Sequence, residues 1–158
     1  DEIMVARLFD GQRSMFQRAL GERILLTMTT LDPACVIRTD SSQLIAAIMN
    51  LLANARDALP HGGHVEIAVR RRSAVPREAG QADAPEGPLV AISVRDNGHG
   101  MTPEVLQQSR TPFFTTKSEA GGSGLGLSTV EGFTRQSGGV LRIESAPERG
   151  TLVTMLFP

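Results

Sequence analysis

The sequence predicts an α+β domain: one mixed sheet, mostly antiparallel, with its helices packed on one face. Two kinds of periodicity indicate this class. Segments in which apolar and polar residues alternate, such as 64–70 and 89–95, are typical of half-buried strands. Longer segments in which apolar residues recur every three or four positions, such as 40–59, are typical of amphipathic helices. Since each kind of element buries one side only, two packed layers satisfy both.

The composition limits the class of protein. The chain has 158 residues, 41% of them hydrophobic, which suits a single domain with a real core. A net charge of −1 and the lack of Trp and Tyr argue against a nucleic-acid-binding surface. No apolar run approaches the ~20 residues of a membrane span. We expect a cytoplasmic domain without direct membrane contact. Since Asp1 stands where an initiating Met would be, we also expect this chain to be part of a longer protein, either soluble or membrane-anchored.

The first half of the chain carries a capping signal and a single cysteine. The expected elements are a helix over residues 2–20, strands at 24–29 and 35–37, and a helix from Asp40 to about Leu59. Asp40 with Gln43 three positions later is typical of a helix start. Cys35 is the only cysteine, so the chain has no internal disulfide and suits a reducing compartment. Because it lies in an apolar run, we expect a buried thiol rather than a nucleophile.

One face of the helix at 40–59 is unusually polar. Asn50, Asn54 and Asp57 share a stripe about 60° wide at the helical 100° per residue, opposite the apolar face. A plain solvent face is the simple interpretation. However, Asn and Asp are poor helix formers, and solvent faces usually carry Lys, Glu and Arg. A binding role for this stripe is therefore a reasonable hypothesis.

The second half alternates strands with glycine-rich turns. Strands are expected at 64–70 and 89–95, joined by a flexible loop over about 73–88. A turn at 96–101 is followed by a helix from Thr102 to about Ser109 and by a mobile flap around Phe113 and Phe114. The last expected elements are a helix from Leu125 to Ser137 and strands at 140–144 and 151–157. Residues 121–127, GGSGLGL, run directly into that last helix. The first amides of a helix lack internal partners and can bind an anion, so this loop is a candidate phosphate cradle as well as a plain flexible loop.

Five motifs occur in a fixed order along the chain. They are Asn50-x-x-x-Asn54-Ala55, Asp96-x-Gly98-x-Gly100, Pro112-Phe113-Phe114, Gly122-x-Gly124-Leu125-Gly126-Leu127 and Gly150-Thr151. Together they resemble the sequence boxes of the ATP-binding catalytic domain of bacterial sensor histidine kinases, in the GHKL superfamily. The resemblance covers essentially the whole chain, so it implies a single domain over 1–158. It also implies the Bergerat fold, a two-layer α/β sandwich with an ATP lid over about 101–121.

The resemblance implies ATP and Mg²⁺ as cofactors. Asn54 is then expected to ligate Mg²⁺ through its amide oxygen, which suits a cation that keeps several waters. Asn50 is expected to contact phosphate or metal-bound water, and Lys117 to approach phosphate as a point charge. Asn50 and Lys117 are therefore the candidate catalytic residues.

The same resemblance assigns the remaining nucleotide contacts. Asp96 is expected to accept the adenine amino protons, while Thr151 holds a water beside the base. Asp57 is expected to contact the nucleotide through water, and Gly98 and Gly100 to let the chain pass close to it. The expected phosphate loop consists of Gly122, Gly124, Leu125, Gly126 and Leu127.

Three functions stay open at this point. The first is a histidine kinase domain, and the second is an ATP hydrolase of the related gyrase, chaperone and mismatch-repair group. Those hydrolases carry Glu where Asn50 stands, and this Glu acts as general base on the attacking water. A neutral amide cannot take that proton, so Asn50 favours the kinase. A nucleotide-responsive binding module without chemistry is the third. None of the chain's histidines, His61, His64 and His99, precedes an acidic residue as the family's acceptor histidine does. We therefore expect no autophosphorylation by this chain alone. The expected partners are a separate phosphoacceptor helical hairpin and a response regulator or receiver domain.

Overall fold

A five-stranded mixed sheet forms one layer of the molecule. The computed structural model describes residues 1–73, 85, 87–109 and 126–158. The strands are β1 (Glu2–Met4), β2 (Ile24–Thr30), β3 (Val36–Arg38), β4 (Gly63–Arg72), β5 (Leu89–Asp96), β6 (Val140–Ser145) and β7 (Thr151–Phe157). The main sheet has the order β2-β4-β5-β7-β6, in which only the β2–β4 pair is parallel. The predicted mixed, mostly antiparallel sheet is confirmed.

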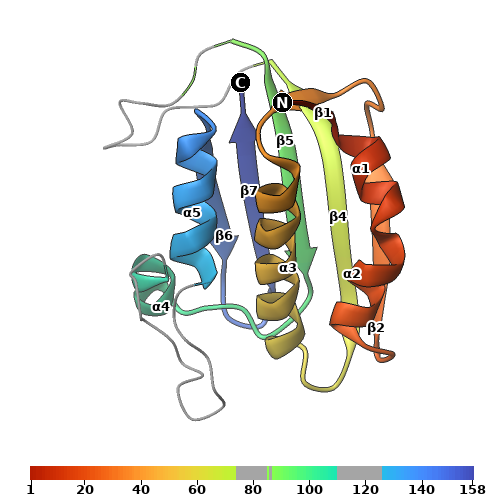
Figure 1. Ribbon diagram of the computed structural model, residues 1–158. Coiled ribbons are helices and arrows are strands. Elements are labelled where there is room, and N and C mark those ends of the chain that lie inside the picture. Colours follow the sequence, from red (N-terminus) through yellow and green to blue (C-terminus); the bar gives the residue numbers. More distant parts are fainter. Residues whose placement is uncertain (74–84, 86, 110–125) are drawn as a thin grey trace.

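Helices form the second layer. They are α1 (Val5–Gly11), α2 (Arg13–Leu20), α3 (Ser41–Asp57), α4 (Pro103–Gln108) and α5 (Gly126–Gln136). Figure 1 shows α1, α2, α3 and α5 on the same face of the sheet, with α3 near its centre. This is the predicted two-layer α/β sandwich. No helix within the described ranges is both long and apolar enough to cross a membrane.

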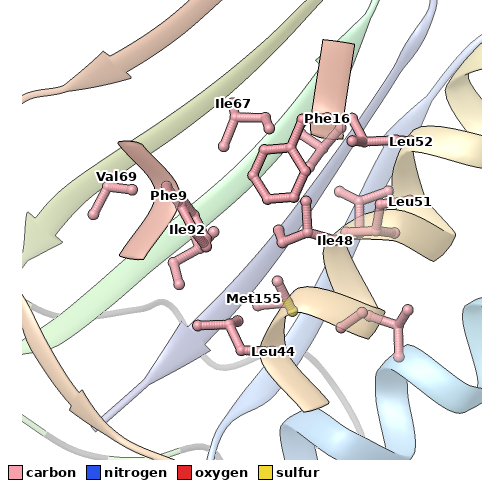
Figure 2. Packing of buried hydrophobic residues seen from close by; sticks show 14 of the residues in the cluster. Phe9, Phe16, Leu44, Ile48, Leu51, Leu52, Ile67, Val69, Ile92 and Met155 are labelled. Carbon is pink, nitrogen blue, oxygen red and sulfur yellow. The ribbon is translucent and has the colours of Figure 1, made fainter. Parts of the chain in front are cut away.

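The core lies between these two layers. Side chains from α1, α2 and α3 meet residues of the central strands there, such as Ile67, Ile92 and Met155 (Figure 2). Each buried Leu or Ile side chain contributes about 1.5–3 kcal/mol to folding, so this layer interface holds the fold together.

Helix α3 follows the predicted pattern closely. The Asp40 carboxylate accepts a hydrogen bond from the amide of Gln43 at 2.9 Å, as the capping signal required. The face predicted to be apolar is buried along its length, at Leu44, Ile48, Leu51, Leu52, Ala55 and Leu59. Because this face is fixed by the core, the polar stripe at Asn50, Asn54 and Asp57 must point elsewhere.

The N-terminal prediction was wrong in part. A single helix was expected over 2–20, but residues 2–4 form β1, which pairs antiparallel with β3 and buries Ile3 opposite Ile37. The helical remainder is divided at Gln12, the residue between α1 and α2. Apolar residues at helical spacing fit two short helices as well as one long helix, so the period alone could not reveal the break.

Cys35 lies immediately before β3 and is fully buried. Burial raises the pKa of its thiol, and the nearby charge of Asp32 raises it further, while Arg71 opposes both effects. Since the thiolate is the reactive form, this cysteine is unreactive in the folded protein. The prediction of a buried thiol is confirmed.

Candidate functional site

A row of three polar side chains marks one end of the main sheet. Thr151 of β7 lies directly opposite Asp96 of β5 on one side and Ser145 of β6 on the other. Residues directly opposite in antiparallel strands point to the same face. One step further into the sheet, the same face carries Val94 and Val153, which belong to the core. The polar row therefore begins where the hydrophobic layer ends.

Asp96 is the charged member of this row, and it is buried. Only 8% of the residue is exposed, and its Oδ1 accepts a hydrogen bond from the amide of Gly98 at 2.8 Å. Burial raises the pKa of this carboxyl, although backbone hydrogen bonds from Gly98 and Thr151 and the charge of His99 oppose the rise. Asp96 forms no ion pair with any residue that the structure describes. A buried carboxylate without an ion-pair partner is a candidate binding residue for a ligand's hydrogen-bond donors.

The turn after β5 forms backbone hydrogen bonds with two other parts of the protein. The amide of His99 donates to the carbonyl of Ala58, just beyond the end of α3, at 3.2 Å. On the other side, the amide of Glu148 in the β6–β7 turn donates to the carbonyl of His99 at 2.7 Å. These bonds fix the position of the turn relative to both α3 and the hairpin.

Both glycines of this turn are required by packing. A Cβ on Gly98 would lie 2.5 Å from the carbonyl oxygen of Ala58. Gly100 has a φ of +68°, and its Cβ would overlap the carbonyl of Ala146. A glycine avoids both conflicts. The close approach seen at these two positions is thus to the protein's own backbone, and the predicted approach to a nucleotide stays a prediction.

The polar stripe of α3 lies beside the start of α5. Asn54 is half-buried, and a Cβ built on Gly126, the first residue of α5, would lie 3.5 Å from its Nδ2 atom. Asn50 is half-buried one turn earlier, and the side chain of Asp57 is 38% exposed, 3.9 Å from Nε of Arg56. The start of α5 therefore lies directly against the stripe at Asn54.

The structure brings most of the described candidate residues toward one end of the domain. Asp96, Gly98, Gly100 and Thr151 belong to one cluster, which the Ala58 contacts join to the end of α3. Asn54 and Gly126 form the neighbouring contact.

The remaining candidates are Leu127 and residues outside the described ranges. Leu127 is partly buried and packs against the hydrophobic core, and its predicted nucleotide contact stays a prediction. Lys117, Gly122, Gly124 and Leu125, and the expected lid from residue 110 onward, lie outside the described residues. The start of that lid contains α4, where the Thr102 hydroxyl caps the amide of Val105 at 3.2 Å as its sequence predicts.

Sequence analysis missed one member of the polar row, Ser145. Its hydroxyl contacts Thr151, Gly150 and Met101 at 2.8–2.9 Å. The strand was predicted to end at residue 144, which left Ser145 in the turn. Extending the alternation of Leu141 and Ile143 by one step would have placed Ser145 on the inner face, opposite Thr151.

The fold is a two-layer α/β sandwich, and comparison with known proteins assigns it to a family of ATPases. Residues 39–158 match the family model described as histidine kinase-, DNA gyrase B-, and HSP90-like ATPase. The chain belongs to this family.

The similar curated proteins are sensor kinases. The chain is 38% identical over 142 residues to the sensor histidine kinase ZraS of Klebsiella oxytoca, which aligns 90% of this chain with 28% of that protein. It is 35% identical over 149 residues to the sensor kinase CckA of Brucella abortus, covering 92% of this chain and 16% of CckA. The chain thus spans about a quarter or less of the length of these relatives.

Solved structures of histidine kinases share the fold. The mycobacterial sensor histidine kinase MprB superposes with a TM-score of 0.75 at 24% identity, covering 100% of this chain and 96% of that one. Full-length ShkA in complex with AMPPNP gives a TM-score of 0.78 at 20% identity, covering 100% of this chain and 30% of ShkA. The predicted fold class is confirmed by these likenesses.

Proposed function

We propose that this chain is the Mg-ATP-binding catalytic domain, over residues 1–158, of a two-component sensor histidine kinase. In this role it delivers the γ-phosphate of ATP to a histidine on a separate phosphoacceptor hairpin. Its sensor-kinase relatives support the proposal. The single observation that carries it is the buried Asp96, held by the Gly98 amide beside Thr151 and without an ion-pair partner among the described residues.

The residues present fit the adenine end of ATP. Asp96 accepts the adenine amino protons, and a hydrogen bond to a charged group of this kind is worth about 1.5–3 kcal/mol. Thr151, directly opposite, supplies a second polar group beside the base. The clamped glycine turn keeps Asp96 in place, since the amide of Gly98 is one of its partners.

The polar stripe of α3 and the start of α5 fit the phosphates and the metal. Asn54 holds Mg²⁺ through its amide oxygen, an oxygen ligand of the kind that this cation prefers. Asn50 contacts phosphate or metal-bound water, and Asp57 acts through water. Gly126 and the preceding residues Gly122, Gly124 and Leu125 are the proposed phosphate contacts, and Lys117 is the proposed source of a positive charge. When bound, Mg²⁺ neutralises the charge that develops during phosphoryl transfer.

A kinase is favoured over a hydrolase by the residue at position 50. Asn50 is neutral, so it cannot take a proton from an attacking water as a general base would. The proposed chemistry is then mostly positioning and charge stabilisation, with the acceptor domain supplying the base. A response regulator or receiver domain is the downstream partner in this scheme.

Two of the three histidines have one ring nitrogen engaged within the protein. His64 Nε2 is bonded to the Thr27 hydroxyl at 2.6 Å, and His99 Nδ1 lies 2.8 Å from the carbonyl of Gly100. None of the three histidines precedes an acidic residue. The chain alone is therefore expected to bind ATP without phosphorylating itself.

Two measurements test this function. Calorimetry of the folded chain should detect ATP binding that depends on Mg²⁺. Mixing the chain with a phosphoacceptor hairpin from the parent protein and labelled ATP should yield acid-labile phosphohistidine on the hairpin. A folded chain that ignores millimolar ATP, or that releases phosphate rapidly without any acceptor, would contradict the proposal.

A further inference from the structure

The Ser145 hydroxyl is the centre of a small hydrogen-bond network at the polar row. It accepts a hydrogen bond from the amide of Met101 at 2.9 Å. It also lies 2.8 Å from the carbonyl oxygen of Gly150 and 2.9 Å from the hydroxyl of Thr151. Three different segments of the chain therefore meet at one oxygen atom.

The direction of these bonds follows from counting protons. A serine hydroxyl has one proton to donate and two lone pairs to accept with. A carbonyl can only accept, so the Ser145 proton goes to Gly150. The amide of Met101 occupies one lone pair of Ser145. The bond between the two hydroxyls must then be donated by Thr151 to the other lone pair of Ser145.

This direction fixes what Thr151 offers to a ligand. Its only hydroxyl proton points toward Ser145, so its remaining hydrogen-bonding capacity consists of lone pairs. Asp96, directly opposite Thr151 on β5, also offers only lone pairs when ionised. The two neighbouring groups are therefore both acceptors, and they repel a ligand edge that presents an oxygen.

We propose that Ser145 is a positioning residue that sets nucleobase selectivity, by holding the Thr151 hydroxyl as an acceptor beside Asp96. This inference rests on the proposed function, because it takes ATP as the ligand. Adenine presents a 6-amino donor to the pair, whereas hypoxanthine presents a 6-oxo acceptor. An oxygen at that position finds two acceptors and no donor. A site built to accept a hydrogen bond from its ligand strongly rejects an analogue that lacks the donor group. An apolar pocket discriminates much less between a ligand and an analogue with an added group.

The test compares ATP with inosine triphosphate. In Ser145→Ala, the Thr151 hydroxyl loses its acceptor and can turn its proton toward the base. The ratio of the ATP affinity to the inosine triphosphate affinity should fall about five- to tenfold, because the net free energy of one hydrogen bond corresponds to a change of about this size. Ser145→Thr keeps a hydroxyl and should restore the ratio. A merely structural role would weaken both nucleotides equally and leave the ratio unchanged, which would overturn the inference.

A second pair of variants tests the same point through Thr151. Thr151→Ser keeps the hydroxyl and should keep the ratio, while Thr151→Val removes it. In the Thr151→Val background, Ser145→Ala should no longer change the ratio, since the coupling between neighbours is then gone. If the ratio still changes, Ser145 acts by another route and the inference fails. A wild-type chain that binds both nucleotides equally also overturns it but leaves nucleotide binding intact, whereas a chain that binds neither overturns the proposed function itself.

Discussion

Gly98 lies against Ala58 with no space for a side chain between them. A Cβ on Gly98 would come within 2.5 Å of the Ala58 carbonyl oxygen and 2.8 Å of its Cβ. The turn after β5 and the end of α3 are thus fixed relative to each other by direct backbone packing. Asp96 and Asn54 lie on these two segments, so the contact also fixes the position of Asp96 relative to Asn54.

Replacing Gly98 by alanine should therefore destabilise the domain. The added methyl group forces the turn away from α3, and overpacking of this kind costs about 1–3 kcal/mol. Urea unfolding followed by circular dichroism measures the effect. Gly132, in the middle of α5, is the matched control because a Cβ added there would meet no atom within 4 Å. Gly132→Ala should stabilise the domain by about 0.5–1 kcal/mol, the usual gain in a helix interior. Equal effects at the two positions would show that the Gly98 contact is unimportant.

Asp96→Asn should weaken ATP binding at least tenfold, about the value of a hydrogen bond to a charged group. The amide keeps the size of the side chain but removes the charge and adds a donor. Calorimetry at neutral pH measures the affinity. Arg95→Gln, on the exposed neighbouring residue of β5, is the control and should leave the affinity nearly unchanged. Unaltered affinity in Asp96→Asn would refute the adenine assignment.

The raised pKa of Asp96 predicts a pH dependence of stability. Because burial raises this pKa, the folded state binds the proton more tightly than the unfolded chain does. The free energy of unfolding of the wild type should then rise relative to that of Asp96→Asn as pH falls from neutral toward about 4, the ordinary value for Asp. Denaturation series of the two proteins at several pH values measure this difference. A difference that falls with decreasing pH would mean that the carboxyl pKa is lowered instead.

Asn54→Ala should abolish the Mg²⁺ dependence of ATP binding, because the amide oxygen is the proposed metal ligand. Calorimetry with and without Mg²⁺ measures the change. Ser42→Ala, at the exposed start of the same helix, is the control and should keep the full dependence. Persistent Mg²⁺ dependence in Asn54→Ala would place the metal elsewhere.

The sequence predicted the elements whose signals are local. Helix α3 was predicted nearly to its ends because Asp40 caps it and its apolar face repeats every three or four residues. The long strands β4 and β5 were predicted from alternation alone, to within two residues at either end. The strand β1 could not be predicted, since its pairing with β3 joins residues about 34 positions apart.

The candidate site shows the same limit. Asp96 and Thr151 were singled out from their motifs, but their position in one row depends on the register of three strands. Ser145 had no motif of its own and gains its contacts only from that register. The reason for Gly98 and Gly100 was likewise not visible, because Ala58 and Ala146 are distant in sequence.

The buried position of Cys35 has a practical consequence. As the only cysteine of the chain, it gives a single alkylation site, and its thiol is shielded while the domain stays folded. The rate of labelling by a maleimide dye would therefore report how often the region around β3 opens. A reporter cysteine could also be introduced on the surface for fluorescence work without first removing the native one.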